Sequence, residues 1–133
     1  MHRLVTLDAS GPLPVARVAG EIDLANATRL RQELLGLADE FDWLIVDLTA
    51  VSYADSSGIK VLFDLARDLR RRSQSLAVAV PASSPLRRLL KITNFQEVAP
   101  ICDDVEIAVE LIVKPDDLQI PQERASGRDD VSR

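Results

Sequence analysis

The chain has 133 residues, a formal net charge of −5 and an apolar fraction of 47%. Its single cysteine and single histidine exclude an internal disulfide and a histidine-based triad or metal cluster. The negative charge argues against nucleic acid as the main partner, because phosphate contacts need a basic surface. No apolar run reaches the ~18 residues of a membrane span, and Asp8 interrupts the N-terminus before a secretory signal could form. We expect a cytoplasmic protein without a membrane partner.

The first predicted elements are two strands and a helix. Residues 4–7 and 15–19 alternate weakly between apolar and polar positions on either side of a turn rich in glycine and proline, which predicts a hairpin. Apolar residues then recur at helical spacing over 27–37, with Asp23 or Asn26 available as the N-cap.

Strands and helices alternate through the rest of the predicted domain. The pattern predicts a central strand at 43–48, a buried strand at 76–80 and a short strand at 98–101. Between and after them it predicts helices at 59–69, 85–93 and 105–112. Such alternation implies an α/β fold with a largely parallel sheet. We expect residues 1–113 to form one domain and residues 114–133, which show no sustained period, to form a disordered tail.

A polar turn, Asp55-Ser56-Ser57-Gly58, separates the central strand from the next helix. A hydroxyl at this position lies beside backbone N–H groups that have no helical partner, so a phosphoryl group on Ser56 would meet free amides and the positive end of the helix dipole. Gly58 is expected to leave room for the loop of another protein. The alternative interpretation is purely structural, because Asp and Ser are also the usual capping residues before a helix.

Three segments resemble the STAS family of anti-sigma-factor antagonists. Residues 20–23, Gly-Glu-Ile-Asp, are similar to the family's Gly-Glu-Leu-Asp. Residues 47–59, Asp-Leu-Thr-Ala-Val-Ser-Tyr-Ala-Asp-Ser-Ser-Gly-Ile, resemble its Asp-Leu-Ser-x-Val-x-Phe-x-Asp-Ser-Ser-Gly-Leu, and residues 84–90 are similar to the start of its third helix. The likeness covers about residues 4–113 and implies a small mixed β-sheet with helices packed against it.

The resemblance implies a regulatory binding module and not an enzyme. In this family the unphosphorylated module binds an anti-sigma factor and frees the sigma factor, so that it regulates transcription, often in a stress response. The anti-sigma factor is commonly also a serine-protein kinase that uses ATP and Mg²⁺, and a PP2C-type phosphatase reverses the mark. The acceptor corresponds to Ser56, and no cofactor or metal is implied. The predicted partner-binding residues are Asp23, Asp55, Ser56, Ser57, Gly58 and Lys60.

Lys60 differs from the family motif, because the family often has a small residue at that position. It could contact an acidic partner or steady the phosphate, or it could simply be a solvated lysine.

Three other classes of function share single features with this sequence. A STAS module that acts as a scaffold, in a stressosome or a lipid-transport complex, would have the same fold without the phosphate switch. A serine hydrolase would need a base near Ser56, but the only histidine is His2 and no Gly-x-Ser-x-Gly is present. A receiver domain with Asp47 or Asp55 as phosphoacceptor would need an acidic pair after the first strand, where only Asp8 stands.

Overall fold

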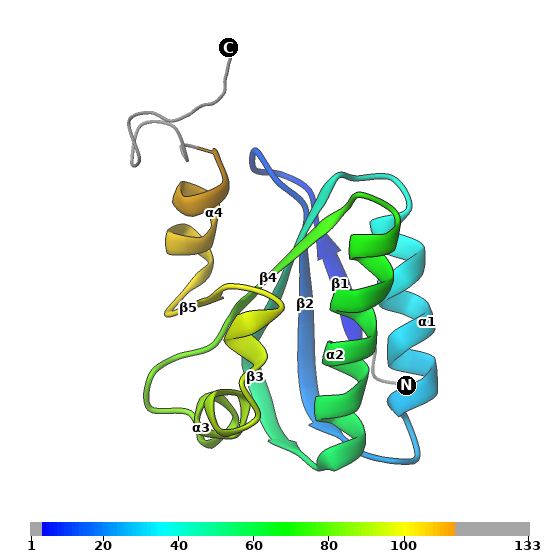
Figure 1. The fold of residues 1–133 in the computed structure, drawn as a ribbon, viewed down its shortest axis with the longest axis vertical. Coiled ribbons are helices and arrows are strands. Elements are labelled where there is room, and N and C mark those ends of the chain that lie inside the picture. Colours follow the sequence, from blue (N-terminus) through cyan, green and yellow to red (C-terminus); the bar gives the residue numbers. More distant parts are fainter. Residues whose placement is uncertain (1–3, 114–133) are drawn as a thin grey trace.

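The structure, a computed structural model, describes residues 4–113, so the predicted tail at 114–133 lies outside the described residues. A five-stranded sheet with the order β1-β2-β3-β4-β5 carries four α-helices and a short 3-10 helix, η1 (Figure 1). β1 pairs antiparallel with β2 and the other neighbours are parallel, so the predicted mixed α/β fold is confirmed. The elements are β1 (Val5–Asp8), β2 (Val15–Ile22), α1 (Ala27–Ala38), β3 (Trp43–Ala54), α2 (Ser56–Arg71), β4 (Ser75–Ala79), α3 (Pro85–Ile92), η1 (Phe95–Glu97), β5 (Ile101–Cys102) and α4 (Val105–Val113).

Helices cover the two faces of the sheet unequally. α1 and α2 lie side by side on one face, and α4 lies on the other (Figure 1). The larger core is on the α1/α2 side, where Leu34 and Leu65 are fully buried with Val46 of β3. Ile45, the preceding residue of β3, points to the opposite face and packs with Ala108 of α4, as the two-residue period of a strand requires. Each fully buried leucine stabilises the fold by about 1.5–3 kcal/mol.

β3 is the middle strand, as predicted, but it extends six residues beyond the predicted end at Leu48. Its second half keeps pairing with β2, up to the pair Ile22 and Ala54. Two register shifts, between Arg17 and Ala19 and between Gly20 and Glu21 of β2, each give β3 one extra residue. Such a bulge breaks the alternation of side chains, which is why the pattern of the sequence did not show this part of the strand.

The last strand is shorter than predicted and begins later. The sequence predicted a strand at 98–101, whereas the structure has η1 followed by β5 at Ile101–Cys102. Asn94 adopts a left-handed conformation, with φ of 62°, and turns the chain so that Phe95 enters the core. There the Phe95 ring meets Phe63 of α2 edge to face, at 5.1 Å between centroids. Burial of this ring fixes the path of the chain ahead of β5.

Within residues 4–113, no helix combines the length and the apolar character needed to cross a lipid bilayer.

Candidate functional site

The loops after β2 and β3 lie side by side at one end of the domain. β2 and β3 are parallel, so their carboxyl ends meet at the same edge of the sheet, at the bottom of Figure 1. The amide of Asp55 donates a hydrogen bond of 3.1 Å to the carbonyl oxygen of Ile22. The structure therefore brings together the Asp23 segment and the Asp55-Ser56-Ser57-Gly58 turn, which are about thirty residues apart in the chain.

Asp55 caps α2 and fixes where the helix begins. It has an extended backbone, and its Oδ1 accepts hydrogen bonds from the amides of Ser57 at 2.9 Å and Gly58 at 3.3 Å. The next residue, Ser56, is the first of the helix, and its side chain is exposed. The hydroxyl of Ser56 is thus presented to solvent on a rigid, capped helix start, which is accessible to another protein.

This cap corrects one expectation about the helix start. The sequence suggested that free amides would hold a phosphate on Ser56, but the carboxylate of Asp55 already accepts from two of those amides. A phosphate on Ser56 would also have that carboxylate as a like-charged neighbour.

Ser57 and Gly58 act on the site through the backbone and through packing. Ser57 is half-buried and contributes its amide to the cap. Gly58 is buried, and a Cβ placed on it would lie 2.8 Å from Cγ2 of Ile22 and 3.3 Å from Cβ of Ala54. The expected open approach for the loop of a partner does not exist at Gly58, because β2 and β3 already fill that space. The glycine instead lets α2 start directly against the two strands.

Asp23 braces the loop between β2 and α1. Its Oδ1 accepts from the amide of Asn26 at 3.2 Å, and its own amide donates to Oδ1 of Asn26 at 3.0 Å. Nδ2 of Asn26 also donates to the carbonyl oxygen of Glu21, at 2.8 Å. Asn26 is the N-cap residue of α1, although its side chain accepts no bond from the helix. The loop is thus held in one shape by reciprocal bonds that leave the Asp23 carboxylate half-buried at the surface.

Lys60 lies on the next turn of α2 and extends away from Ser56. Its side chain is 74% exposed, and its Nζ is 2.9 Å from Oδ2 of Asp64. A surface pair of this kind contributes only about 0.3–0.5 kcal/mol. Its geometry is that of a solvated lysine, which was one of the two interpretations from the sequence.

An apolar surface beside the polar turn was not predicted. A groove of about 200 Å³ separates the end of β3 from α3, and Tyr53 and Leu89 line it. Tyr53 is 56% exposed, and Ile92, one helical turn after Leu89, is 66% exposed. Clustered exposed side chains of this size mark interaction sites. We call the groove lined by Tyr53 and Leu89 the apolar groove, and Ile92 lies beside it on α3.

The sequence held a signal for this groove. In α3 the buried positions are Leu86 and Leu90, which define the face that packs on the core. Ile92 falls outside that stripe, whereas Leu89, three residues after Leu86, lies at its edge and stays 40% exposed. Leu24, which follows Asp23, is a further exposed apolar residue at the same end of the domain, at 78% exposure.

The comparison with known proteins decides the family. The STAS domain model matches residues 5–108. The chain belongs to the STAS domain family. Over 85 residues the chain is 39% identical to the anti-sigma-B factor antagonist of Listeria monocytogenes, an alignment that covers 63% of this chain and 74% of that protein. It is 34% identical over 84 residues to the anti-sigma-B factor antagonist of Bacillus subtilis, covering 63% and 76%.

Solved structures agree with the fold of this STAS domain. The crystal structure of an anti-sigma factor antagonist from Mycobacterium paratuberculosis superposes with a TM-score of 0.74 at 24% sequence identity, covering 83% of this chain and 93% of that one. The predicted family and the predicted mixed sheet are therefore confirmed.

One acidic residue of the STAS motif has no part in the Ser56 end of the domain. Asp47 is 6% exposed and lies in the middle of β3, where its carboxylate accepts from Nη1 of Arg17 at 2.6 Å and from the amide of Thr49 at 2.9 Å. The pair with Arg17 ties β2 to β3. Its burial and its bonds are those of a structural residue and not of an accessible phosphoacceptor.

Proposed function

We propose that this STAS domain is an anti-sigma-factor antagonist whose unphosphorylated form binds an anti-sigma factor through the end of the domain that carries Ser56. The observation that carries the proposal is the exposed hydroxyl of Ser56 on a capped helix start, flanked by the Asp23 loop and by the apolar groove. The names of the curated relatives support the same function. In this proposal the chain is a binding module, and the release of a sigma factor in the cytoplasm follows from its binding.

Two kinds of contact are proposed to hold the partner. Tyr53, Leu89 and Ile92 offer exposed apolar area, which gains about 25 cal/mol per Å² when it is removed from water. The half-buried carboxylates of Asp23 and Asp55 lie on the adjoining loops and favour basic side chains on the partner. Ser56 lies between these two regions, so a partner that binds both of them must pack closely against the Ser56 side chain.

The switch is proposed to be phosphorylation of Ser56 by the anti-sigma factor acting as a serine kinase, with a PP2C-type phosphatase restoring the binding form. A phosphate adds between one and two negative charges where the partner would pack against apolar side chains, and burial of an unpaired charge is strongly unfavourable. A buried charge left without a partner costs about 3–5 kcal/mol. Even half of that lowers the affinity more than about tenfold.

Phosphorylation and binding are tested with the unmodified and the enzymatically phosphorylated protein. Candidate anti-sigma kinases from the same organism are incubated with the full chain and ATP, and peptide mass spectrometry locates the phosphate. We expect it on Ser56, which Ser56→Ala removes. Ser52, an exposed serine on β3, provides the matched control: Ser52→Ala should leave phosphorylation unchanged. Phosphate that persists in Ser56→Ala would disprove the assignment.

Calorimetric titration of the anti-sigma factor measures the switch itself. We expect the phosphorylated form to bind more than about tenfold more weakly than the unmodified form. Circular dichroism should show the same fold for both. Equal affinities would favour the non-switching scaffold function, in which the same end of the domain binds a partner constitutively.

The apolar groove is tested with a pair of matched substitutions. Ile92→Asp places a charge beside the groove, one helical turn after Leu89, whereas Ile107→Asp places the same charge on α4, where Ile107 is 43% exposed. We expect Ile92→Asp to lower the affinity for the anti-sigma factor more than about tenfold and Ile107→Asp to leave it within about twofold. Equal effects of the two substitutions would remove the groove from the proposed interface.

A further inference from the structure

The face of the sheet opposite α1 and α2 is only partly covered. α4 packs over β3, β4 and β5, where Ile45, Ala77 and Ala108 form the smaller apolar cluster. No described helix covers β1 and the adjoining part of β2 on this face (Figure 1). A cleft of about 750 Å³ lies there, bounded on one side by the start of α4. It is separate from the Ser56 end, because none of the predicted site residues lines it.

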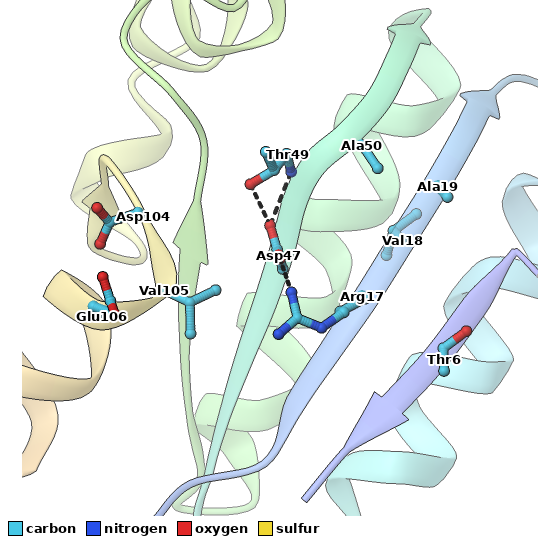
Figure 2. Close-up of a pocket in the computed structure, with 10 residues that line it drawn as sticks. All are labelled: Thr6, Arg17, Val18, Ala19, Asp47, Thr49, Ala50, Asp104, Val105 and Glu106. Carbon is cyan, nitrogen blue, oxygen red and sulfur yellow. Dashed lines mark hydrogen bonds and ion pairs between the residues drawn. The ribbon is translucent and has the colours of Figure 1, made fainter. Parts of the chain in front are cut away.

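The floor of the cleft is polar and firmly built. Figure 2 shows Arg17, Asp47 and Thr49 joined by hydrogen bonds in its middle. The second terminal nitrogen of Arg17, Nη2, lies 3.3 Å from Oδ2 of Asp8. Arg17 is therefore neutralised on both sides. The small side chains of Ala19 and Ala50, beside a bulge in β3, leave the floor open to solvent.

The rim of the cleft is acidic. Asp104 and Glu106 line it at the start of α4, and both are exposed (Figure 2). Among residues 4–113, neither forms an ion pair. With Asp47, the lining contains three carboxylates and one guanidinium group, which is itself paired. An anionic ligand would meet uncompensated negative charge here, whereas a cation would be attracted.

We propose that this cleft is a second docking surface, for an extended segment of a partner protein that carries lysine or arginine side chains. The sign of the charge selects a basic occupant. The shape selects a polypeptide, because a small molecule needs an enclosed cavity that buries most of its surface, and the cleft is open over β1 and β2. The cleft and Ser56 lie on different parts of the domain, so the STAS domain could hold two partners at once.

The first test uses two short peptides and the full chain labelled with ¹⁵N. One peptide alternates lysine and valine over seven residues, and the other has glutamate in place of lysine. We expect the lysine peptide to shift the amide signals of Thr6, Ala19, Ala50 and Glu106, to leave Ser56 unchanged, and to bind more weakly as salt is added. The glutamate peptide should not bind. No binding, equal binding of both peptides, or shifts centred on Ser56 would overturn the proposal.

Variants then test the charge of the cleft and the shape of the cleft separately. Asp104→Asn with Glu106→Gln removes the rim charges but keeps an N-cap at 104, because Asp104 accepts from the amide of Ile107 and asparagine can do the same. This variant should bind the lysine peptide about tenfold more weakly, as expected for two ion pairs at the edge of a contact. Glu40→Gln with Glu97→Gln removes two exposed charges elsewhere and should leave binding within about twofold.

A steric variant and an oligomerisation measurement complete the test. Ala50→Leu fills the floor without a change of charge and should abolish binding of the lysine peptide, with an unchanged circular dichroism spectrum. Peptide binding that survives Ala50→Leu, or an equal loss in the Glu40/Glu97 control, would refute the cleft as the site. Light scattering that shows a dimer, together with shifts of the cleft amides on dilution, would assign the face to a second copy of the chain and would also overturn the proposal.

Discussion

Gly58 of α2 lies so close to Ile22 of β2 that a Cβ on the glycine would be 2.8 Å from Cγ2 of the isoleucine. Ile22 is fully buried, and its β-branched side chain has little rotamer freedom with which to move away. This contact sets how closely the start of α2 approaches the end of the sheet, and it therefore sets the position of Ser56.

Gly58→Ala should destabilise the domain by about 1–3 kcal/mol, because an added methyl group overpacks this contact. Gly36 provides the matched control, since it lies within α1 and a Cβ there would meet nothing within 4 Å. Gly36→Ala should stabilise the domain by about 0.5–1 kcal/mol, through the higher helix propensity of alanine. Urea unfolding measures both. An unchanged or raised stability of Gly58→Ala would show that α2 can shift without cost.

Asp55→Ala should lower the free energy of unfolding by about 1 kcal/mol, because the amides of Ser57 and Gly58 lose the cap. Asp55→Asn should keep most of this stability, since asparagine caps a helix about as well. If the carboxylate also contacts the partner, Asp55→Asn will weaken binding of the anti-sigma factor while stability stays near that of the unmodified protein. Equal loss of stability in both variants would contradict the role of Asp55 as a cap.

Asp23→Ala should weaken partner binding more than it weakens the fold. The lost bond to the amide of Asn26 is worth about 0.5–1.5 kcal/mol of stability. Asn26→Ala is the control, because it removes the two bonds that the Asn26 side chain makes in the same loop and leaves the carboxylate of Asp23 in place. We expect calorimetry to show a larger loss of affinity for Asp23→Ala. The same loss in both variants would mean that only the shape of the loop matters.

Asp8 should make the stability depend on pH in the acid range. Hydrogen bonds from the hydroxyl and the amide of Ser10, with a smaller contribution from Arg17, lower the pKa of Asp8 from 3.8 to about 2. A lowered pKa stabilises the folded state above the unfolded value of 3.8, and this contribution is lost as the pH falls towards about 2.

The difference in unfolding free energy between the unmodified protein and Asp8→Asn should therefore be constant above about pH 5 and should shrink between about pH 4 and pH 2. Urea unfolding at several pH values measures it. Ser10→Ala should raise the pKa of Asp8 in an NMR titration, because it removes the hydroxyl bond, which is the largest cause of the lowered pKa, and keeps the backbone bond. A pKa that stays unchanged in Ser10→Ala would contradict the assigned cause.

The sequence by itself determined the order of the elements and the position of the polar turn. Apolar residues at helical spacing located α1 and α2, and the apolar run from Trp43 to Leu48 located the central strand, because these signals depend on residues only a few positions apart. The same local logic identified the turn of Asp55 to Gly58 as a helix start, and Ser84 with Pro85 as another. The family motif then identified Ser56 as the predicted phosphoacceptor.

Only the tertiary structure decided what surrounds Ser56 and what lies on the opposite face. The contact between Gly58 and Ile22, the pairing of Arg17 with Asp47, and the groove between Tyr53 and Leu89 each join residues about thirty or more positions apart. The register between strands and the close packing of helices on them set such contacts, and the two register shifts between β2 and β3 change which side chains share a face. Periodicity within one segment carries no information about the register of its neighbour, so these relationships became visible only in the folded chain.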